Sequence, residues 1–263
     1  MFDFFASLPF IYQALIGGLF TWFVTAVGAS FVIFFKTINY NLLNLMLSFA
    51  AGVMMASSFF SLIVPSIELS EHLYTNNFVI PTLGFLSGIA FIILADLLLT
   101  KLLKNASNKT TKKRTMLLVG SITLHNIPEG MCVGVAFASV AFGLEGATLM
   151  SAIMLTFGIA LQNFPEGVAV SLPLKKESVS AKRAFFIGQA SGMVEPVSSL
   201  IACVFVIIIR NILPFLLTFS AGAMIGVVVS ELIPEAQSYN KNLSTLGLAV
   251  GFSVMMLLDV ALG

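Results

Sequence analysis

Residues 116–142 read MLLVGSITLHNIPEGMCVGVAFASVAF, an apolar stretch with His125, Asn126 and Glu129 in its middle. The hydrocarbon core of a bilayer is about 30 Å thick and needs about 20 apolar residues per helix. Ionisable groups inside such a stretch are energetically expensive and by default indicate function. The stretch therefore predicts a transmembrane helix that contributes to a polar site within the membrane.

The composition extends this prediction to the whole chain. Of its 263 residues 58% are hydrophobic and 10% are charged, with a mean hydropathy of +1.03, whereas soluble domains carry about 25% charged residues. A net charge of +1 gives no electrostatic reason to expect nucleic acid as a partner. The two cysteines lie in apolar runs, which excludes a disulfide framework. The first ten residues lack Lys and Arg, so the first apolar run is expected to be retained rather than cleaved.

Apolar runs between polar breaks predict an all-α polytopic membrane protein with eight transmembrane helices in a single domain over 1–263. The runs lie at 11–35, 42–66, 79–103, 116–142, 147–173, 183–209, 212–235 and 243–262. Twelve of the 13 Lys and Arg residues lie in the loops after spans one, three, five and seven, and only Arg210 lies on the other side. Cytoplasmic loops carry the excess of basic residues. We therefore expect both termini outside and a short basic cytoplasmic loop at about 104–115.

Three sequence patterns each occur twice. They are Gly84-x3-Gly88-x7-Asp96 with Gly247-x3-Gly251-x7-Asp259, Phe49-x-Ala51-Gly52-x-Met54 with Phe219-x-Ala221-Gly222-x-Met224, and Asn126-x-Pro128-Glu129-Gly130 with Asn163-x-Pro165-Glu166-Gly167. Each pair joins an odd-numbered span to an even-numbered one, so its members run in opposite directions. The pattern predicts inverted repeats of spans 1–3 and 6–8 around a central antiparallel pair, spans 4 and 5. The Gly-x3-Gly patterns predict close helix packing, within the chain or across a homodimer.

Span four places chemically suited side chains on one helix face. His125 and Glu129 are four residues apart and share that face, and Asn126 borders it. Pro128 has no N–H, so it frees the carbonyl group of Leu124 next to these side chains. For a single helix of this kind, a proline kink beside an incidental buried carboxylate is the simpler interpretation. A second copy of the same pattern argues against that interpretation.

Span five repeats the arrangement with Gln162, Asn163 and Glu166, and Glu195 directly precedes a proline in span six. Together the central spans offer one imidazole, two carboxylates and three amide oxygens. Such a donor set suits divalent zinc, iron, manganese or cadmium, and its negative charge offsets that of the ion. Cys132 lies on the face of His125 as an accessory ligand or, as we expect, a packing residue.

The segments Leu124–Gly130 (LHNIPEG) and Leu161–Gly167 (LQNFPEG) resemble the signature helices of the ZIP (Zrt/Irt-like) divalent-metal transporters. Residues 49–54, 192–196 and 230–235 resemble its prokaryotic GufA-like branch. The resemblance implies an eight-helix importer with both termini outside and two metal sites. It assigns His125, Glu129, Gln162 and Glu166 to the first site, and Asn126, Glu129, Asn163, Glu166 and Glu195 to the second.

The resemblance also implies a transport path and a cargo. Asn44 and Met54 match positions on the extracellular entrance route, and Glu231 and Asp259 match positions on it or near it. Some relatives carry Asp at the position of Asn163, so the second site is expected to be weaker here. The expected cargo is zinc first, then cadmium, iron(II) and manganese, with no prosthetic group. The branch implies a bacterial inner membrane.

Two alternatives of other classes remain at this point. An intramembrane metal-dependent enzyme needs an open metal position and a base, and the donor set offers both, although the sequence has no HExxH run. A metal-independent, proton-linked solute carrier would use the buried carboxylates for protons. That carrier predicts that chelators leave its activity unchanged.

Overall fold

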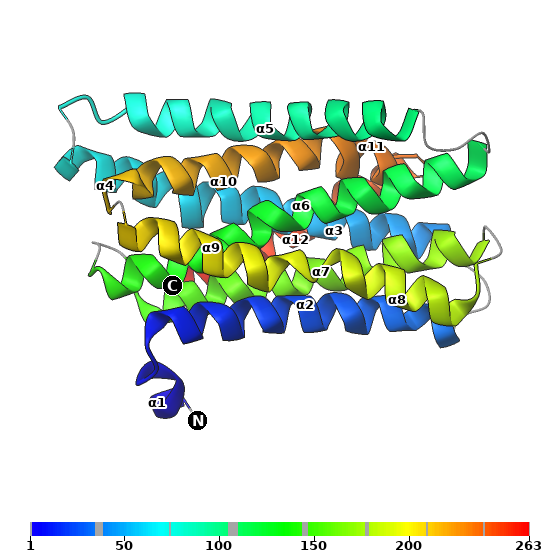
Figure 1. Ribbon diagram of the computed structural model, residues 1–263, viewed down its shortest axis with the longest axis horizontal. Helices are drawn as coiled ribbons and strands as arrows, with labels where there is room; N and C mark the ends of the chain where they lie inside the picture. The colour runs from blue at the N-terminus through cyan, green and yellow to red at the C-terminus, as the bar shows by residue number, and fades with distance from the viewer. Residues whose placement is uncertain are drawn as a thin grey trace.

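The computed structural model describes residues 2–34, 39–73, 75–104, 110–143, 147–176, 179–208, 210–238 and 240–262. Within these ranges the regular structure is helical and contains no strand. The long helices lie side by side along one axis of the molecule, and both termini lie at the same end of the bundle (Figure 1).

The helices follow the predicted spans closely. In chain order they are α1 (Phe2–Ala6), α2 (Phe10–Phe34), α3 (Tyr40–Ser57), the π-helix η1 (Ser58–Ile63), α4 (Val64–Leu73), α5 (Val79–Lys104), α6 (Thr110–Ala141), α7 (Leu149–Lys176), α8 (Ala181–Ser191), α9 (Val194–Ile208), the 3-10 helix η2 (Arg210–Ile212), α10 (Leu213–Val227), the π-helix η3 (Val228–Leu232), α11 (Ile233–Ala236) and α12 (Lys241–Leu262).

Seven stretches in the described part of the chain are long and apolar enough to cross a membrane. They contain α2, α3 to α4, α5, α7, α8 to α9, α10 to α11, and α12. Helix α6 is 32 residues long but is not among them, because His125, Asn126 and Glu129 lower the hydropathy of its apolar stretch. Seven stretches of sufficient length and hydropathy thus support the assignment as a membrane protein. The more polar helix α6 runs among them (Figure 1).

The structure departs from the expected segments in three places. A short helix, α1, precedes the first span. Helix α6 already begins at Thr110, so the second half of the predicted basic loop at about 104–115 is helical, and residues 105–109 lie outside the described part of the chain. The sixth span is broken into α8 and α9 at Gly192 and Met193, which places Glu195 in the first turn of α9. Negative charge is favourable at that end of a helix.

Glycines allow close packing in two equivalent helix pairs, α3 with α12 and α10 with α5. A Cβ atom at Gly52 of α3 would lie 2.1 Å from the Leu248 carbonyl oxygen of α12, and one at Gly222 of α10 would lie 2.1 Å from the Phe85 carbonyl oxygen of α5. Small residues allow such close approach of membrane helices. The reciprocal contacts, Gly251 against Phe49 and Gly88 against Phe219, are equally close. The Gly-x3-Gly patterns therefore pack within the chain.

The signature glycines of α6 and α7 join these helices to two others. Gly167 of α7 packs against the Thr25 carbonyl oxygen of α2, where a Cβ would lie at 2.1 Å. Gly130 of α6 packs against the Glu195 carbonyl oxygen of α9, where the distance would be 2.3 Å. The site therefore lies where α2, α6, α7 and α9 meet.

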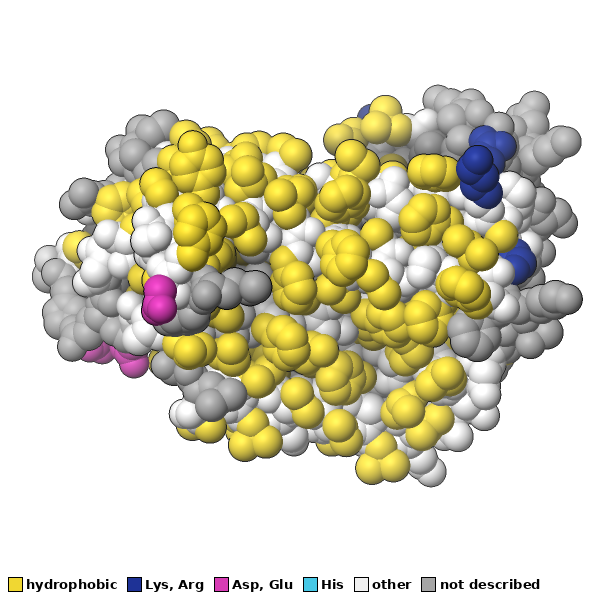
Figure 2. All heavy atoms as spheres, turned by 90° about the horizontal axis from the view of Figure 1, so that it is seen from below, with side chains coloured by type: hydrophobic (Ala, Val, Ile, Leu, Met, Phe, Trp, Pro, Cys, Tyr) yellow, Lys and Arg dark blue, Asp and Glu magenta, His cyan; other side chains and the backbone are white. Residues whose placement is uncertain are grey.

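The surface matches a bilayer environment. Large apolar side chains such as Leu94 and Leu257 are exposed around the middle of the molecule. On the face drawn in Figure 2 apolar side chains form a broad belt, with Lys and Arg toward one end and Asp and Glu toward the other. A soluble protein would not expose so large an apolar area.

Candidate metal centre

The centre is built around two carboxylates on adjacent helices. Glu129 of α6 is fully buried, and Glu166 of α7 is 4% exposed. The two carboxyl groups interact directly with one another. Gln162, one turn before Glu166, donates from Nε2 to Glu129 Oε1 at 2.7 Å. The predicted pairing of the two signature helices is therefore present in the fold.

A second polar cluster surrounds Glu195 of α9. Asn163 donates from Nδ2 to Glu195 Oε2 at 2.7 Å, and Thr25 of α2 donates from Oγ1 to Glu195 Oε1 at 3.3 Å. Both carboxylate oxygens of Glu195 thus accept hydrogen bonds from the protein itself. Gly192 leaves room for this arrangement, since a Cβ there would lie 2.9 Å from Glu195 Oε1.

Several oxygens at the centre are buried without a hydrogen-bond partner among the described residues. They are Asn126 Oδ1, Glu129 Oε2, Gln162 Oε1, Asn163 Oδ1 and Glu166 Oε2. A buried polar atom without a partner costs free energy of about 1–3 kcal/mol, so five of them close together need an explanation. Each of these atoms is an acceptor, and a cation satisfies acceptors. The arrangement can hold a divalent ion through two carboxylate and up to three amide oxygens.

The Asn126 side chain is oriented by a hydrogen bond to the backbone of α8. Its Nδ2 donates to the Ser191 carbonyl oxygen at 3.0 Å, which leaves Oδ1 as the free end of the amide. Gln162 and Asn163 likewise use their N–H groups on carboxylates and keep their oxygens free. The orientation of all three amides therefore presents acceptors rather than donors.

His125 lies in α6 one turn before Glu129, but its side chain is outside the described part of the structure. In the part that is described, no three His, Cys, Asp or Glu side chains converge closely enough to bind a metal by themselves. Among the described side chains, amide oxygens are the further ligands that lie beside Glu129 and Glu166.

The four residues assigned to the predicted transport path lie at different depths in the bundle. Asp259 lies near the end of α12 and accepts a hydrogen bond from Ser61 of η1 at 2.9 Å. Asn44 is buried near the start of α3, which at 1.5 Å per residue is about 25 Å from Ser61. Glu231 lies in η3, which contacts α3 and leads directly into α11. Asn44 and Asp259 therefore lie toward opposite ends of the bundle, and Met54 is buried in the core. The transport path assigned to these residues stays a prediction.

Comparison with known proteins decides the family. A family model described as ZIP Zinc transporter matches residues 106–259. The zinc transporter ZIP11 of Xenopus tropicalis is 35% identical over 96% of this chain and 98% of its own length. The zinc transporter ZIPB of Bordetella bronchiseptica is 33% identical over 95% of this chain and 81% of its own. The chain belongs to the ZIP family.

A third relative bears on the branch. The zinc transporter GufA of Myxococcus xanthus is 38% identical over 56% of each chain. The resemblance drawn from the two signature helices is thus confirmed at the level of the ZIP family, and a GufA-like branch fits these matches.

This ZIP chain has a cavity at the end that carries the C-terminus. The cavity has a volume of about 210 Å³, and Asp259, Ser61, Ser139, Ser151 and Leu155 are among the residues that line it. It draws polar groups from η1, α6, α7 and α12, and we refer to it as the vestibule.

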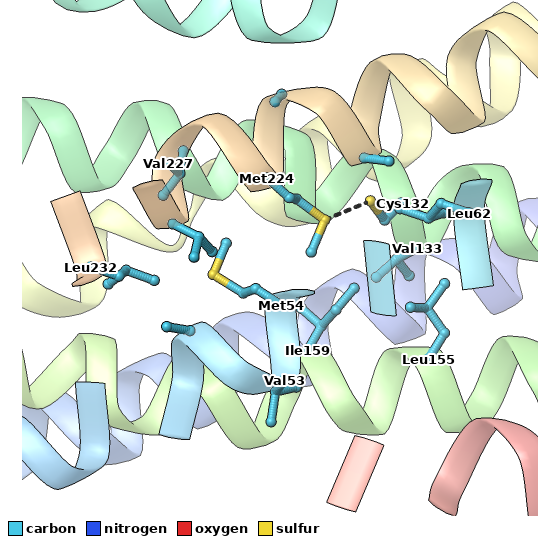
Figure 3. Close-up of a cluster of buried hydrophobic side chains, with 14 of the residues drawn as sticks. Val53, Met54, Leu62, Cys132, Val133, Leu155, Ile159, Met224, Val227 and Leu232 are labelled. Atoms are coloured by element: carbon cyan, nitrogen blue, oxygen red, sulfur yellow. Dashed lines mark hydrogen bonds between the residues drawn. The ribbon is translucent and has the colours of Figure 1, made fainter. Parts of the chain in front are cut away.

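A cluster of apolar and sulfur-containing side chains separates this vestibule from the metal centre. Figure 3 shows these side chains pointing into one space between the helices; they include Met54, Leu62, Cys132, Val133, Leu155, Ile159 and Met224. Along α6 the order is Ser139 in the vestibule, Cys132 in the cluster, and Glu129 at the centre. Along α7 it is Ser151, Ile159 and Gln162. The cluster fills the space between the vestibule and the candidate metal centre.

Sequence reasoning missed Thr25 and its neighbour Thr21. Both are buried in α2, Thr25 bonds Glu195, and the Thr21 carbonyl oxygen accepts from Asn163 Nδ2 at 3.3 Å. Two threonines one turn apart in an otherwise apolar span were the available signal. In this ZIP chain they bring span one into contact with the polar centre.

Proposed function

We propose that this chain is an importer of divalent transition metals, zinc first, that moves the ion through the centre formed by α6 and α7. The observation that carries the proposal is the group of buried acceptor oxygens around Glu129 and Glu166 that lack hydrogen-bond partners among the described residues. The names of the relatives, all zinc transporters, support zinc as the main cargo. Cadmium, iron(II) and manganese suit the same donors.

The primary ion site in this proposal comprises His125, Glu129, Gln162 and Glu166. The two carboxylates neutralise the ion, and the amide oxygen of Gln162 completes the set with the imidazole. Amide oxygen is a weaker zinc ligand than imidazole, and a transporter must release what it binds. Binding that is selective yet reversible is consistent with this combination.

A second ion site, with Asn126, Glu129, Asn163, Glu166 and Glu195, is proposed to be weak. The Asn163 amide already donates to Glu195 Oε2, and the Thr25 hydroxyl donates to Oε1. An ion there would have to displace both hydrogen bonds. The amide of Asn163 thus occupies the position relative to Glu195 that a second cation would take.

For the architecture we propose eight spans, namely the seven apolar stretches described above and α6. We also propose that both termini lie outside and that the protein lies in a bacterial inner membrane. Lys101, Lys182, Arg183 and Lys241 lie at the end of the bundle opposite the termini, which supports that orientation. The equivalent glycine contacts of α3 with α12 and of α10 with α5 support inverted repeats. So do the π-helices at Ser58–Ile63 and Val228–Leu232, since each is followed closely by a proline.

The test is zinc uptake into proteoliposomes by wild type and by Glu166→Ala, with cadmium, iron(II) and manganese as competitors. The variant should lose roughly 100-fold in uptake, because it removes a charged ligand. Glu235→Ala is the matched control, because Glu235 is an exposed carboxylate on α11 away from the centre. It should transport like wild type.

The alternatives predict other results. Absence of uptake by correctly folded wild-type protein would refute transport and favour the metal-dependent enzyme. Uptake of a solute other than metal that persists in the presence of chelator would favour the proton-linked carrier. Equal uptake by Glu166→Ala and wild type would refute the site.

A further inference from the structure

The apolar cluster between the vestibule and the metal centre contains a sulfur pair. Cys132 Sγ of α6 lies 3.3 Å from Met224 Sδ of α10 (Figure 3). Both side chains are fully buried. A thiol and a thioether from two helices thus meet between the vestibule and the centre.

We propose that Cys132 and Met224 form a binding site for a thiophilic divalent ion, cadmium in preference to zinc, on the path to Glu129. The proposal rests on the proposed function, because it gives the ion a reason to pass this point. Thiolate and thioether sulfur are soft ligands, which select soft ions over those that prefer oxygen. Such a site makes the path itself discriminate among metals before the carboxylates do.

The geometry suits two ligands to one ion. With the zinc–sulfur distance of about 2.3 Å, two sulfurs 3.3 Å apart would subtend an angle of about 90° at a zinc ion. A small separation of α6 and α10 opens that angle toward the tetrahedral value. Binding replaces the thiol proton by the ion, and the proton is released to water together with the water that the ion sheds.

An oxygen ligand stands beside the pair. Ser220 lies one turn before Met224 on α10 and is fully buried. Its hydroxyl oxygen has no partner of normal hydrogen-bond geometry among the described residues, and it lies beside the Cys132 thiol. The carboxylate of Glu129 is also close enough to interact with that thiol. A hydroxyl, a thiol and a thioether therefore converge within reach of the charged centre.

On both α6 and α10 the sulfur-containing residue lies deeper in the molecule than the residue that lines the vestibule. On α10, Leu217 lines the vestibule, and Ser220 and Met224 follow it deeper in the molecule. On α6, Cys132 lies between Ser139 of the vestibule and Glu129 of the centre. An ion that travels between the vestibule and Glu129 must pass the sulfur pair.

Cadmium titration of the purified chain tests the site without any need for transport. Wild type should develop the ultraviolet charge-transfer absorption of a cadmium–thiolate bond. Cys132→Ser should abolish this absorption, and Met224→Leu should weaken cadmium binding roughly tenfold. Cys203→Ser is the matched control. Cys203 is also fully buried, but its thiol donates to the Gly134 carbonyl oxygen on the α6–α9 contact, at 3.1 Å, so this variant should keep the absorption.

Uptake then connects the site to selectivity. The cadmium-to-zinc uptake ratio should fall roughly tenfold in Cys132→Ser and stay unchanged in Cys203→Ser. No cadmium–thiolate absorption in wild type, or equal absorption in Cys132→Ser, would overturn the proposal whatever the uptake results. Absorption at Cys132 in a protein that takes up no metal would instead refute the proposed function and leave the binding site standing.

Discussion

Helices α6 and α7 carry the same pattern, Asn-x-Pro-Glu-Gly, but the helices that face them differ. Gly130 of α6 packs on α9 at Glu195, whereas Gly167 of α7 packs on α2 at Thr25. Glu195 and Thr25 therefore occupy equivalent places beside the two copies. One copy faces a carboxylate-bearing residue and the other a hydroxyl-bearing one, and this difference makes the surroundings of the two copies asymmetric.

The asymmetry determines what each asparagine does. Asn163 of α7 donates to the Glu195 carboxylate, whereas Asn126 of α6 donates to the Ser191 carbonyl oxygen. Both keep a free oxygen directed away from those bonds. The repeated motif thus supplies equivalent ligand oxygens. The neighbouring residues outside the motif, such as Glu195 and Ser191, determine whether a second cation can bind beside it.

The largest expected effect comes from removing the close contact under each motif. A Cβ at Gly167 would lie 2.1 Å from a backbone oxygen, and one at Gly130 would lie 2.3 Å from another. Because backbone cannot give way as a flexible side chain can, Gly167→Ala and Gly130→Ala should each lower stability by about 3 kcal/mol. The effect is measured by thermal unfolding in detergent, monitored as the fraction of monodisperse protein that remains after heating.

Gly226→Ala is the control for that comparison. A Cβ at Gly226 of α10 would lie 3.7 Å from its nearest neighbour, a side-chain atom of Ile92, which is ordinary contact. This variant should be neutral or slightly stabilised, since alanine favours a helix over glycine. If Gly167→Ala unfolds at the same temperature as Gly226→Ala, the contact between α2 and α7 is looser than the structure indicates.

The span boundaries and the paired carboxylates were predictable from sequence because each rests on a local pattern. Apolar length fixed the spans, and the spacing within one helix fixed the faces of Gln162 and Glu166. Thr25 was not predictable, because a threonine in an apolar helix commonly bonds its own backbone, as Thr25 also does with the Thr21 carbonyl oxygen. Its second bond, to Glu195, depends on the packing of α2 against α9.

The position of Asn44 relative to Asp259 could not be predicted from sequence for a related reason. A match between single positions identifies a residue without saying which end of its helix lies near the site. Only the assembled bundle shows that Asn44 and Asp259 lie at opposite ends. The break of span six at Gly192 was likewise signalled only in part, by the proline after Glu195.

Asn163→Asp should have the next largest effect, because it places a second carboxylate against Glu195 in place of a donor. Two buried carboxylates repel unless a cation lies between them. The variant should therefore raise bound zinc from about one to about two ions per chain, measured by elemental analysis of protein passed through a desalting column. Asn126→Asp, which would face a backbone oxygen, should stay at about one ion per chain. Two ions in wild type would contradict the role assigned to the Asn163 amide.

The smallest expected effect is at the one ligand position that distinguishes the copies in sequence, His125 in α6 and Gln162 in α7. Gln162 uses its N–H on Glu129 and keeps its oxygen free. In Gln162→His an imidazole nitrogen would replace that oxygen, and nitrogen holds zinc more firmly. Uptake should then show a KM and a kcat that are both several-fold lower, because tighter binding slows release. Unchanged kinetics and unchanged metal preference would mean that Gln162 positions Glu129 without itself binding the ion, and the two copies would then differ only in their neighbours.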